Sequence, residues 1–309
     1  MKSTVLKFLF FLSFFNGNAQ QSKVKTIAEL TLEKDAFVFF VIGDWGRQGE
    51  YNQSEVAASM KKCATKFEPS FIISTGDNFY SDGVASIYDP QWAKSFENIY
   101  VGNDVQIDWW VVLGNHDYRG NPQAEIDYSK ISRRWRMPSR YFTNVHELKD
   151  GKKARFIFTD TSPFVKKYHK EPLKYTDLTK QDTARQIKWI DSVFNISNEE
   201  WKFVIGHHPV YSSGKHGNTA ELIDMLKPRM EKNNVQGYFC GHEHDLQHQQ
   251  PKGSKVDYFV SGAGSETRPT SKFDFTKYAE SVAGFAMVSI KENKLTLYYI
   301  DKNQKIVYQ

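Results

Sequence analysis

The sequence predicts an α/β fold in which mixed β-sheets carry helices on their outer faces. Along the chain, apolar runs as short as strands alternate with amphipathic stretches that are long enough for helices. This alternation in the first half favours parallel strands, because parallel neighbours need a crossover connection between them. The 309 residues are 40% hydrophobic, a proportion that suits a globular core.

Nine apolar runs are the predicted strands of these sheets. They cover residues 37–43, 70–75, 109–113, 154–160, 202–206, 235–240, 257–261, 284–290 and 294–300. The last two runs are joined by the short polar stretch "KENK", which predicts a β-hairpin. Amphipathic helices are predicted near residues 53–67, 90–100, 179–194 and 219–232.

The first 19 residues have the composition of a cleaved export signal. Lys2 and Lys7 supply positive charge, the apolar run "FLFFLSFF" is too short to span a bilayer, and Ala19 suits a cleavage site. We therefore expect a signal peptide over residues 1–19, with an N-terminal membrane anchor as the alternative. No later stretch reaches the ~18 apolar residues of a membrane helix. The cleaved protein is expected to be exported, whether periplasmic, secreted or surface-associated.

The cysteine content limits the disulfide bonds that the chain can form, and its charge limits the ligands that it can attract. Cys63 and Cys240 are too few for a disulfide framework; both are expected to be buried and free, with a bond between them left open. The net charge of +5 fits an anionic substrate, as weak support. Basic stretches at 133–140 and 166–174 are interpreted as solvated surface or as a cationic rim. Aspartates elsewhere dilute this charge, so no nucleic-acid partner is expected.

Five of the predicted strands end in the same way, with an apolar run, a glycine and then oxygen or nitrogen donors. The endings are "VIGDWG" with Asp44, "STGDNFY" with Asp77 and Tyr80, "LGNHD" with Asn115 and His116, "IGHHP" with His207 and His208, and "CGHEH" with His242 and His244. One such ending alone would be an ordinary turn. Since the carboxyl ends of parallel strands lie along one edge of a sheet, five endings predict a ligand site at that edge.

The donor types indicate metal ions rather than another ligand. Carboxylate, phenol, amide and imidazole groups are offered without any thiolate, which favours Fe, Mn or Zn over a structural zinc knot. Seven donors exceed what one tetrahedral ion takes, so two ions sharing a bridging carboxylate are the simplest solution. A pair of metal ions suits in-line displacement at phosphorus.

On these residues the sequence resembles the calcineurin-like metallophosphoesterases, and in particular the purple acid phosphatases of the tartrate-resistant, type 5 kind. The resemblance extends from residue 36 to the end and includes "DYSKISRRWRMPSRYF" (127–142), "GHHPVYSSGKHG" (206–217) and "DYFVSGAGS" (257–265). Gly46 stands where the wider superfamily has a histidine, and Tyr80 follows Asp77 by three residues. The resemblance implies two mixed β-sheets packed as a sandwich with flanking helices, in a single catalytic domain over residues 36–309.

The resemblance also implies a dinuclear centre of Fe(III) with Fe(II), Zn or Mn. It assigns one group of ligands to Fe(III), namely Asp44, Tyr80, His244 and the bridging Asp77. It assigns a second group to the divalent ion, namely Asp77, Asn115, His207 and His242.

Further residues are expected to act on the substrate. The resemblance implies that His116 and His216 are catalytic without binding metal, contacting phosphate and protonating the leaving group. Asn115 is also expected to contact the substrate, and His208 is expected to do so from the rim of the site. Asp117 is expected to orient His116 or a ligand.

Together these features predict an exported acid phosphatase that hydrolyses phosphate monoesters by attack of a metal-bound hydroxide. A phosphodiesterase or nucleotide pyrophosphatase on the same scaffold is the alternative, which Tyr80 and Gly46 disfavour. A metal-binding protein without hydrolase activity, or one that uses its iron for peroxide chemistry, is a third hypothesis, which His116 and His216 disfavour. Phosphorylated small molecules or phosphoproteins are the expected substrates, and a monomer is the expected state.

Overall fold

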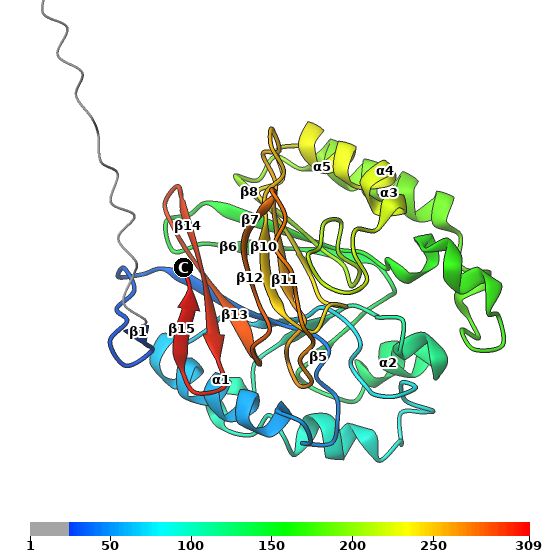
Figure 1. Ribbon diagram of the computed structural model, residues 1–309, viewed down its shortest axis with the longest axis horizontal. Coiled ribbons are helices and arrows are strands. Elements are labelled where there is room, and N and C mark those ends of the chain that lie inside the picture. The colour runs from blue at the N-terminus through cyan, green and yellow to red at the C-terminus, as the bar shows by residue number, and fades with distance from the viewer. Residues whose placement is uncertain (1–24) are drawn as a thin grey trace, which may run out of the picture.

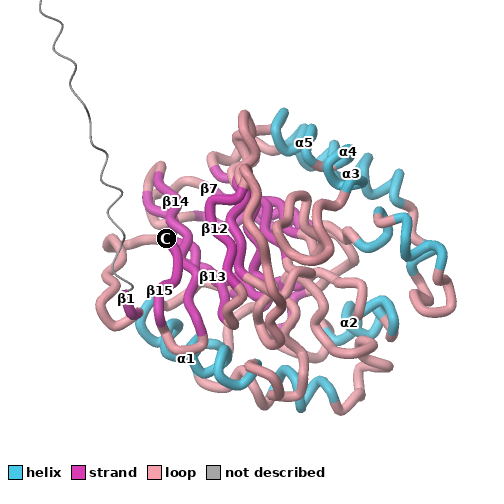
Figure 2. Tube along the Cα trace, in the orientation of Figure 1, coloured by secondary structure: helices cyan, strands magenta, loops and turns pink. Residues whose placement is uncertain are grey.

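Two stacked β-sheets form the centre of the molecule, with helices on the outer face of each (Figure 1). The computed structural model describes residues 25–309. The predicted signal peptide over residues 1–19 lies outside the described residues. Within them, the arrangement confirms the predicted fold class, and Figure 2 shows the strands gathered between the two groups of helices.

The first sheet has eight strands in the order β1-β15-β14-β13-β2-β3-β4-β5. Their bounds are Lys25–Thr26 (β1), Phe37–Ile42 (β2), Ile72–Ser74 (β3), Trp109–Val111 (β4), Trp135–Arg136 (β5), Gly284–Lys291 (β13), Lys294–Asp301 (β14) and Lys305–Tyr308 (β15). The strands from β2 to β5 are parallel, as the early strand–helix alternation predicts. The predicted hairpin is confirmed, because β13 and β14 pair antiparallel along their whole length.

The second sheet has seven strands in the order β12-β10-β11-β9-β8-β7-β6. Their bounds are Phe142–Glu147 (β6), Lys153–Phe158 (β7), Trp201–Ile205 (β8), Gly237–Cys240 (β9), Leu246–Gln249 (β10), Asp257–Ser261 (β11) and Thr276–Glu280 (β12). The run β7-β8-β9-β11 is parallel and its neighbours are antiparallel, so this sheet is also mixed. The sequence did not predict β10, because its buried residues include Gln247 and Gln249, which break the apolar pattern.

Helices cover the outer faces of both sheets. They are α1 (Gln53–Phe67), α2 (Pro122–Tyr128), α3 (Thr183–Ile196), α4 (Ala220–Met225) and α5 (Lys227–Lys232), with the π-helix η1 (Trp92–Glu97) and the 3₁₀ turns η2 (Asn103–Val105), η3 (Asp117–Arg119), η4 (Ser162–Phe164), η5 (Lys166–Lys170) and η6 (Leu178–Lys180). The helix predicted over 219–232 is divided into α4 and α5. Pro228 lies in the first turn of α5, where its missing N–H is tolerated, whereas it would break a continuous helix.

The core between the sheets is largely aromatic. Phe39 of β2 meets Phe156 of β7 and Phe239 of β9 edge-on, with ring centroids 5.2 and 5.9 Å apart. On the outer face of the first sheet, Cys63 of α1 packs against Met287 of β13, with the two sulfur atoms 3.8 Å apart. Cys63 and Cys240 are both buried free thiols, as predicted. The aromatic contacts between the sheets hold them face to face, so that the ends of their strands lie close together.

Candidate metal centre

The ends of β2, β3 and β4 in the first sheet meet the ends of β8 and β9 in the second. Direct contacts join the two sheets there. The backbone N–H of His242 donates to Asp44 Oδ2 at 2.9 Å, and Nδ1 of His207 lies 2.9 Å from the carbonyl oxygen of Thr75. Further contacts and a shared cavity bring all seven predicted ligands together at this junction of the two sheets.

The first group of donors surrounds the phenol of Tyr80. Its hydroxyl lies 2.9 Å from Asp44 Oδ1, 3.0 Å from Asp77 Oδ2 and 3.1 Å from His244 Nε2. Atoms that ligate one ion at about 2.0–2.2 Å stand roughly 3–3.5 Å from one another. The four side chains are all buried, and their spacing fits one metal ion.

The second group of donors surrounds His207. Its Nε2 atom lies 3.1 Å from His242 Nδ1 and 3.5 Å from Asp77 Oδ1. Because Nδ1 faces the carbonyl oxygen of Thr75 and donates its proton there, the lone pair of Nε2 is free to bind metal. Asp77 therefore presents one oxygen to each group, which is the geometry of a bridging carboxylate.

Unsatisfied buried atoms indicate that this site fits cations. Asn115 Oδ1 and His242 Nε2 are buried and have no hydrogen-bond partner among the described residues. Such atoms are costly unless a ligand completes them. A metal ion in the second donor group would be a partner for Asn115 Oδ1, whereas His242 faces that group with Nδ1 and not with Nε2.

The charges within the site also favour a cation. Burial raises the pKa of Asp44 to about 7 and lowers the pKa of His244 to about 4. Burial would raise the pKa of Asp77 as well, but the neighbouring His207 and His116 hold it below its usual range. Burial and the two carboxylates raise the pKa of the Tyr80 phenol. Bound cations would lower the pKa values of Asp44 and Tyr80 and would reinforce the lowered pKa values of Asp77 and His244, since they favour anionic carboxylates and phenol and neutral imidazoles.

Glycines at the strand ends make room for the carboxylates. A Cβ atom at Gly241 would lie 2.3 Å from Asp44 Oδ2, and one at Gly114 would lie 2.1 Å from Asp77 Oδ1. Several predicted ligands adopt left-handed backbone conformations, with φ of 58° at Asp44, 52° at Asp77 and 69° at His242. Strain of this kind is concentrated at functional sites. The recurrent glycine therefore reflects close approach to the ligands.

Gly46 is required by the path of the Tyr80 segment. A Cβ atom at position 46 would lie 1.8 Å from the carbonyl oxygen of Asn78, and the N–H of Tyr80 donates to the carbonyl oxygen of Gly46 at 2.9 Å. A histidine side chain has no room at position 46 while this segment passes there. The absence of the histidine and the presence of the phenol therefore have a common structural cause.

His116 and His216 lie beside the two donor groups. The His116 ring packs 4.5 Å from the ring of Tyr80, and its Nδ1 is 2.5 Å from the carbonyl oxygen of Ser81. The His216 ring lies 4.3 Å from the ring of His242. Both rings line a cavity of about 200 Å³ that also contains Asp77, Asn115 and His242. Each is placed to meet a ligand held there.

His208 differs from the predicted rim position. Its ring is buried, with Nδ1 2.9 Å from the Thr161 hydroxyl and Nε2 2.8 Å from the Tyr168 hydroxyl. One of its ring nitrogens lies within 4.8 Å of nitrogens of His207 and His242, close enough for the three to share an ion. Both nitrogens of His208, however, already have hydroxyl partners. The described geometry places it behind the ligands rather than at the mouth of the cavity.

Asp117 binds backbone N–H groups of two loops and does not hydrogen-bond to the His116 ring. Its carboxylate accepts hydrogen bonds from the N–H groups of Gly114, Asn78 and Phe79, at 2.7–3.2 Å. Burial raises its pKa, and the nearby Glu125 raises it further. Asp117 thus ties the loop after β3 to the loop after β4.

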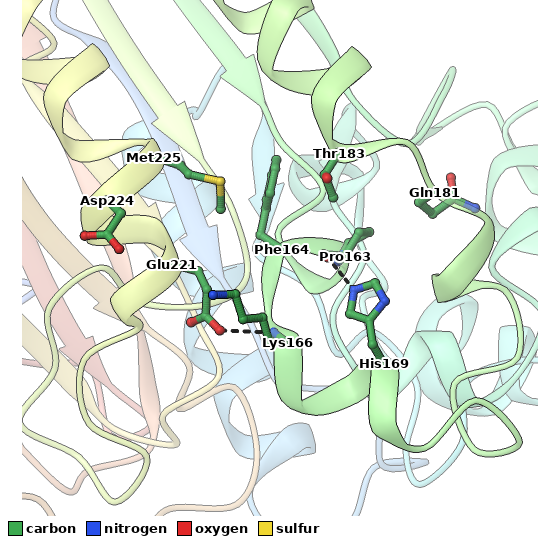
Figure 3. Close-up of a pocket in the computed structure, with 9 residues that line it drawn as sticks. All are labelled: Pro163, Phe164, Lys166, His169, Gln181, Thr183, Glu221, Asp224 and Met225. Carbon is green, nitrogen blue, oxygen red and sulfur yellow. Dashed lines mark hydrogen bonds between the residues drawn. The ribbon is translucent and has the colours of Figure 1, made fainter.

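The sequence did not identify half of the residues that line the cavity. The additional lining residues are Arg119, Lys167, Tyr168, Glu171, Tyr175 and Arg268. They come from loops and 3₁₀ turns with no apolar periodicity, and among them only Lys167 was noted for its charge, within the basic stretch 166–174. A larger cavity, of about 480 Å³, lies on another face of η5 and contains none of the predicted site residues (Figure 3).

Comparison with known proteins agrees with the geometry of the site. The profile of the calcineurin-like phosphoesterase family matches residues 37–246. Purple acid phosphatase 7 of Arabidopsis thaliana is 36% identical, over 97% of this chain and 94% of the relative. Human tartrate-resistant acid phosphatase type 5 is 30% identical, over 89% of this chain and 90% of the relative.

Solved structures share the fold at lower sequence identity. The inner-membrane-complex anchor GAP50 of Plasmodium superposes with a TM-score of 0.74 at 24% identity, covering 89% of this chain and 88% of that one. The purple acid phosphatase PPD1 of yellow lupin gives a TM-score of 0.64 at 14% identity, covering 89% of this chain and 53% of that one. At these identities the likeness concerns the fold alone.

Proposed function

Because this chain belongs to the calcineurin-like phosphoesterase family, with purple acid phosphatases related to it over most of its length, we propose that it is an exported acid phosphatase acting on phosphate monoesters. The observation that carries the proposal is the pair of buried donor groups that share the carboxylate of Asp77. This arrangement suits two neighbouring ions, and such a pair suits displacement at phosphorus.

Each donor group is proposed to hold one ion. Fe(III) would be held by Asp44, Tyr80, His244 and Asp77, and Fe(II), Zn or Mn by Asp77, Asn115, His207 and His242. When bound, the ions supply a hydroxide nucleophile and polarise the phosphate of the ester. The chain itself orients these ligands, through the contact of His207 with Thr75 and the hydrogen bonds of Asp117.

His116 and His216 are the proposed catalytic residues. They line the cavity from different loops, so one can contact the phosphate while the other protonates the leaving group. The Glu243 carboxylate accepts the backbone N–H of His216 at 2.6 Å and lies 3.2 Å from its Nδ1, which directs Nε2 away from Glu243. For His208 we propose support of the His242 ring, whose centroid is 4.5 Å away, in place of substrate contact from the rim.

The cavity favours a phosphate monoester over a diester. Arg119, Lys167 and Arg268 give its wall three cationic side chains against the single carboxylate of Glu171 outside the donor groups. A monoester can carry two negative charges on its phosphate and gains more from this field than a singly charged diester. Phosphorylated small molecules and phosphoproteins are the proposed substrates.

The remaining proposals concern the whole chain. We propose cleavage of the signal peptide over residues 1–19, a single catalytic domain over residues 36–309 and a monomeric exported product. Among residues 25–309, no helix has the length and apolar character needed to cross a bilayer.

An absorption spectrum combined with metal analysis tests the proposal. We expect about two metal ions per chain, including iron, and a visible iron–phenolate band that is lost in Tyr80→Phe. Hydrolysis of p-nitrophenyl phosphate should exceed that of its bis-ester. A metal-loaded protein that prefers the bis-ester would contradict the proposed substrate class, and one that hydrolyses neither would contradict the enzyme assignment.

A further inference from the structure

The loop over residues 262–268 joins segments of both sheets at the metal centre. Ser265 Oγ donates to the carbonyl oxygen of Asp44 at 2.5 Å, and the Gly264 N–H donates to the carbonyl oxygen of Gly43 at 3.1 Å. From the other end of the loop, the Arg268 N–H donates to the carbonyl oxygen of His244 at 2.8 Å. The loop is therefore bonded to the backbone of two predicted ligands that belong to different sheets.

An ion pair connects this loop to the side chains of the first donor group. Arg47 Nη2 donates to Glu266 Oε2 at 2.7 Å. The Arg47 guanidinium lies 3.8 Å from the centre of the Tyr80 ring, and its carbon is 4.8 Å from the Tyr51 ring. Glu266 Oε2 also lies 3.3 Å from Nδ1 of His244, a charge-pair contact that is not aligned as a hydrogen bond. One ion pair thus touches both the phenol and the imidazole.

We propose that Arg47 and Glu266 are a positioning pair that holds Tyr80 and His244 toward the iron site. This inference rests on the proposed function, because it assigns that site to iron. Neither residue lines the cavity of the metal centre, whereas Arg268, which also approaches Glu266, does. Arg47 instead lines a separate cavity of about 240 Å³ on the other side of Tyr80.

Each member of the pair acts on its ligand by a known physical effect. A planar guanidinium over an aromatic face is attracted to the ring and restricts its rotation. Its positive charge also stabilises an anionic phenolate. A carboxylate beside the far nitrogen of an imidazole attracts a proton on that nitrogen and so favours the tautomer that leaves the other nitrogen for the metal. Since the same carboxylate anchors Arg47, losing either residue should disturb both ligands.

The test compares the full-length metal-loaded protein with Arg47→Met, Arg47→Lys and Glu266→Gln. The visible band, the iron content and the rate of iron loss to a chelator are measured, together with kcat and KM for p-nitrophenyl phosphate. Arg155→Met is the matched control, because it removes an arginine from a buried ion pair with Glu199, 2.6 Å long, outside the metal centre. It reports the effect of general destabilisation.

We expect Arg47→Met and Glu266→Gln to lose iron roughly tenfold to a hundredfold faster than the parent. In Arg47→Met the band should move to longer wavelength, because an electron leaves the phenolate more easily once the positive charge above the ring is gone. In Arg47→Lys the band should move less than in Arg47→Met, because the positive charge is kept. Iron should still be lost faster than from the parent, because lysine lacks the flat guanidinium.

Three outcomes would overturn the inference. Iron loss within twofold of the parent in both Arg47→Met and Glu266→Gln would show that the pair does not position the ligands. Equal acceleration in Arg155→Met would attribute the effect to loss of stability. A parent protein that binds no iron would overturn the proposed iron site together with this inference, whereas the first two results leave that site standing.

Discussion

Asp77 gives its two carboxylate oxygens to different groups of donors, which is what a residue shared by two ions must do. Oδ2 faces Tyr80 and Oδ1 faces His207. The backbone N–H of His116 holds Oδ1 at 2.8 Å, so the carboxylate is fixed before any ion binds. At the scale of single residues, the site depends more on this group than on any other.

Asp77→Asn should therefore remove both ions rather than one. The amide keeps the shape but loses the charge that bridging cations require, so we expect the content of both metals to fall and kcat to fall by roughly a thousandfold or more. Metal analysis and p-nitrophenyl phosphate assays measure these changes. Asp82→Asn, at an aspartate whose side chain is 72% exposed, is the control and should retain full metal content. Retention of one ion at full occupancy in Asp77→Asn would argue against a bridge.

At the scale of elements, the 3₁₀ turn η5 separates two cavities. With three residues per turn, Lys166 and His169 lie on one face, and both line the 480 Å³ cavity (Figure 3). Lys167 and Tyr168 lie on other faces and line the cavity of the metal centre. Neighbouring lysines on one short turn therefore have different surroundings.

Lys167→Met should raise KM for a phosphate monoester about threefold to tenfold, with a smaller change in kcat. The reason is the loss of one partly solvated positive charge facing the substrate. Lys166→Met is the matched control and should leave KM unchanged. Steady-state kinetics at low ionic strength checks both variants. An equal rise of KM in both variants would mean that the total charge of η5 matters, and not which of its lysines faces the metal centre.

An ion pair fixes the connection between α3 and β8. Arg155 of β7 makes two hydrogen bonds to Glu199, at 2.6 and 2.8 Å, and both side chains are largely buried. The hydrogen bonds from Arg155 hold the pKa of Glu199 below its usual range. The stabilisation is thus complete above the pKa of an unfolded glutamate, about 4.3, and is lost as the pH falls through the lower folded-state pKa.

Glu199→Gln should lower the free energy of unfolding by about 2–3 kcal/mol at pH 7, because it leaves Arg155 without its counter-charge. The difference from the parent should shrink below about pH 4, where the parent also loses the charged pair. Urea unfolding at both pH values measures this. Glu147→Gln, at an exposed side chain of β6, should show neither effect. A cost that is independent of pH would exclude the charge of Glu199 as its source.

For the whole molecule, the metal centre is the place where the two sheets are joined by polar groups. Its ligands come from both sheets, and its carboxylates are buried. Removing bound cations would leave these groups without compensation. The stability of the assembled sheets should therefore depend on metal occupancy.

Chelation should lower the Tm of the whole protein by about 5–10 °C. Binding at a hundred to a thousand times Kd contributes roughly 3–4 kcal/mol to the folded state, and that loss corresponds to several degrees in a chain of this size. Calorimetry before and after chelation measures the shift, and adding the metals back should reverse it. An unchanged Tm would indicate that the sheets hold together without the ions.

The proposed ligands could be named from the sequence because all seven follow one of five strands that end in a glycine. The signal is local, and the parallel order of the strands then brings distant ligands to one edge. Gly46 and Tyr80 were noted together in the sequence, but only the 1.8 Å approach of Asn78 to a Cβ atom at position 46 explains why they go together. Element boundaries failed where local chemistry interrupts a pattern, as at Pro228 and in the polar strand β10.

By itself, the sequence determined nine of the fifteen strands in the described residues, the donor residues at their ends and the family, because apolar periodicity and short motifs are encoded within a few consecutive residues. Only the tertiary structure decided what surrounds those ends. In the bend that follows β8, the His207 side chain faces His242 and Asp77, while the neighbouring His208 turns to Thr161 and Tyr168. Likewise, the contact of Arg47 with Glu266, 219 positions away, follows from the packing of the two sheets and has no local signal.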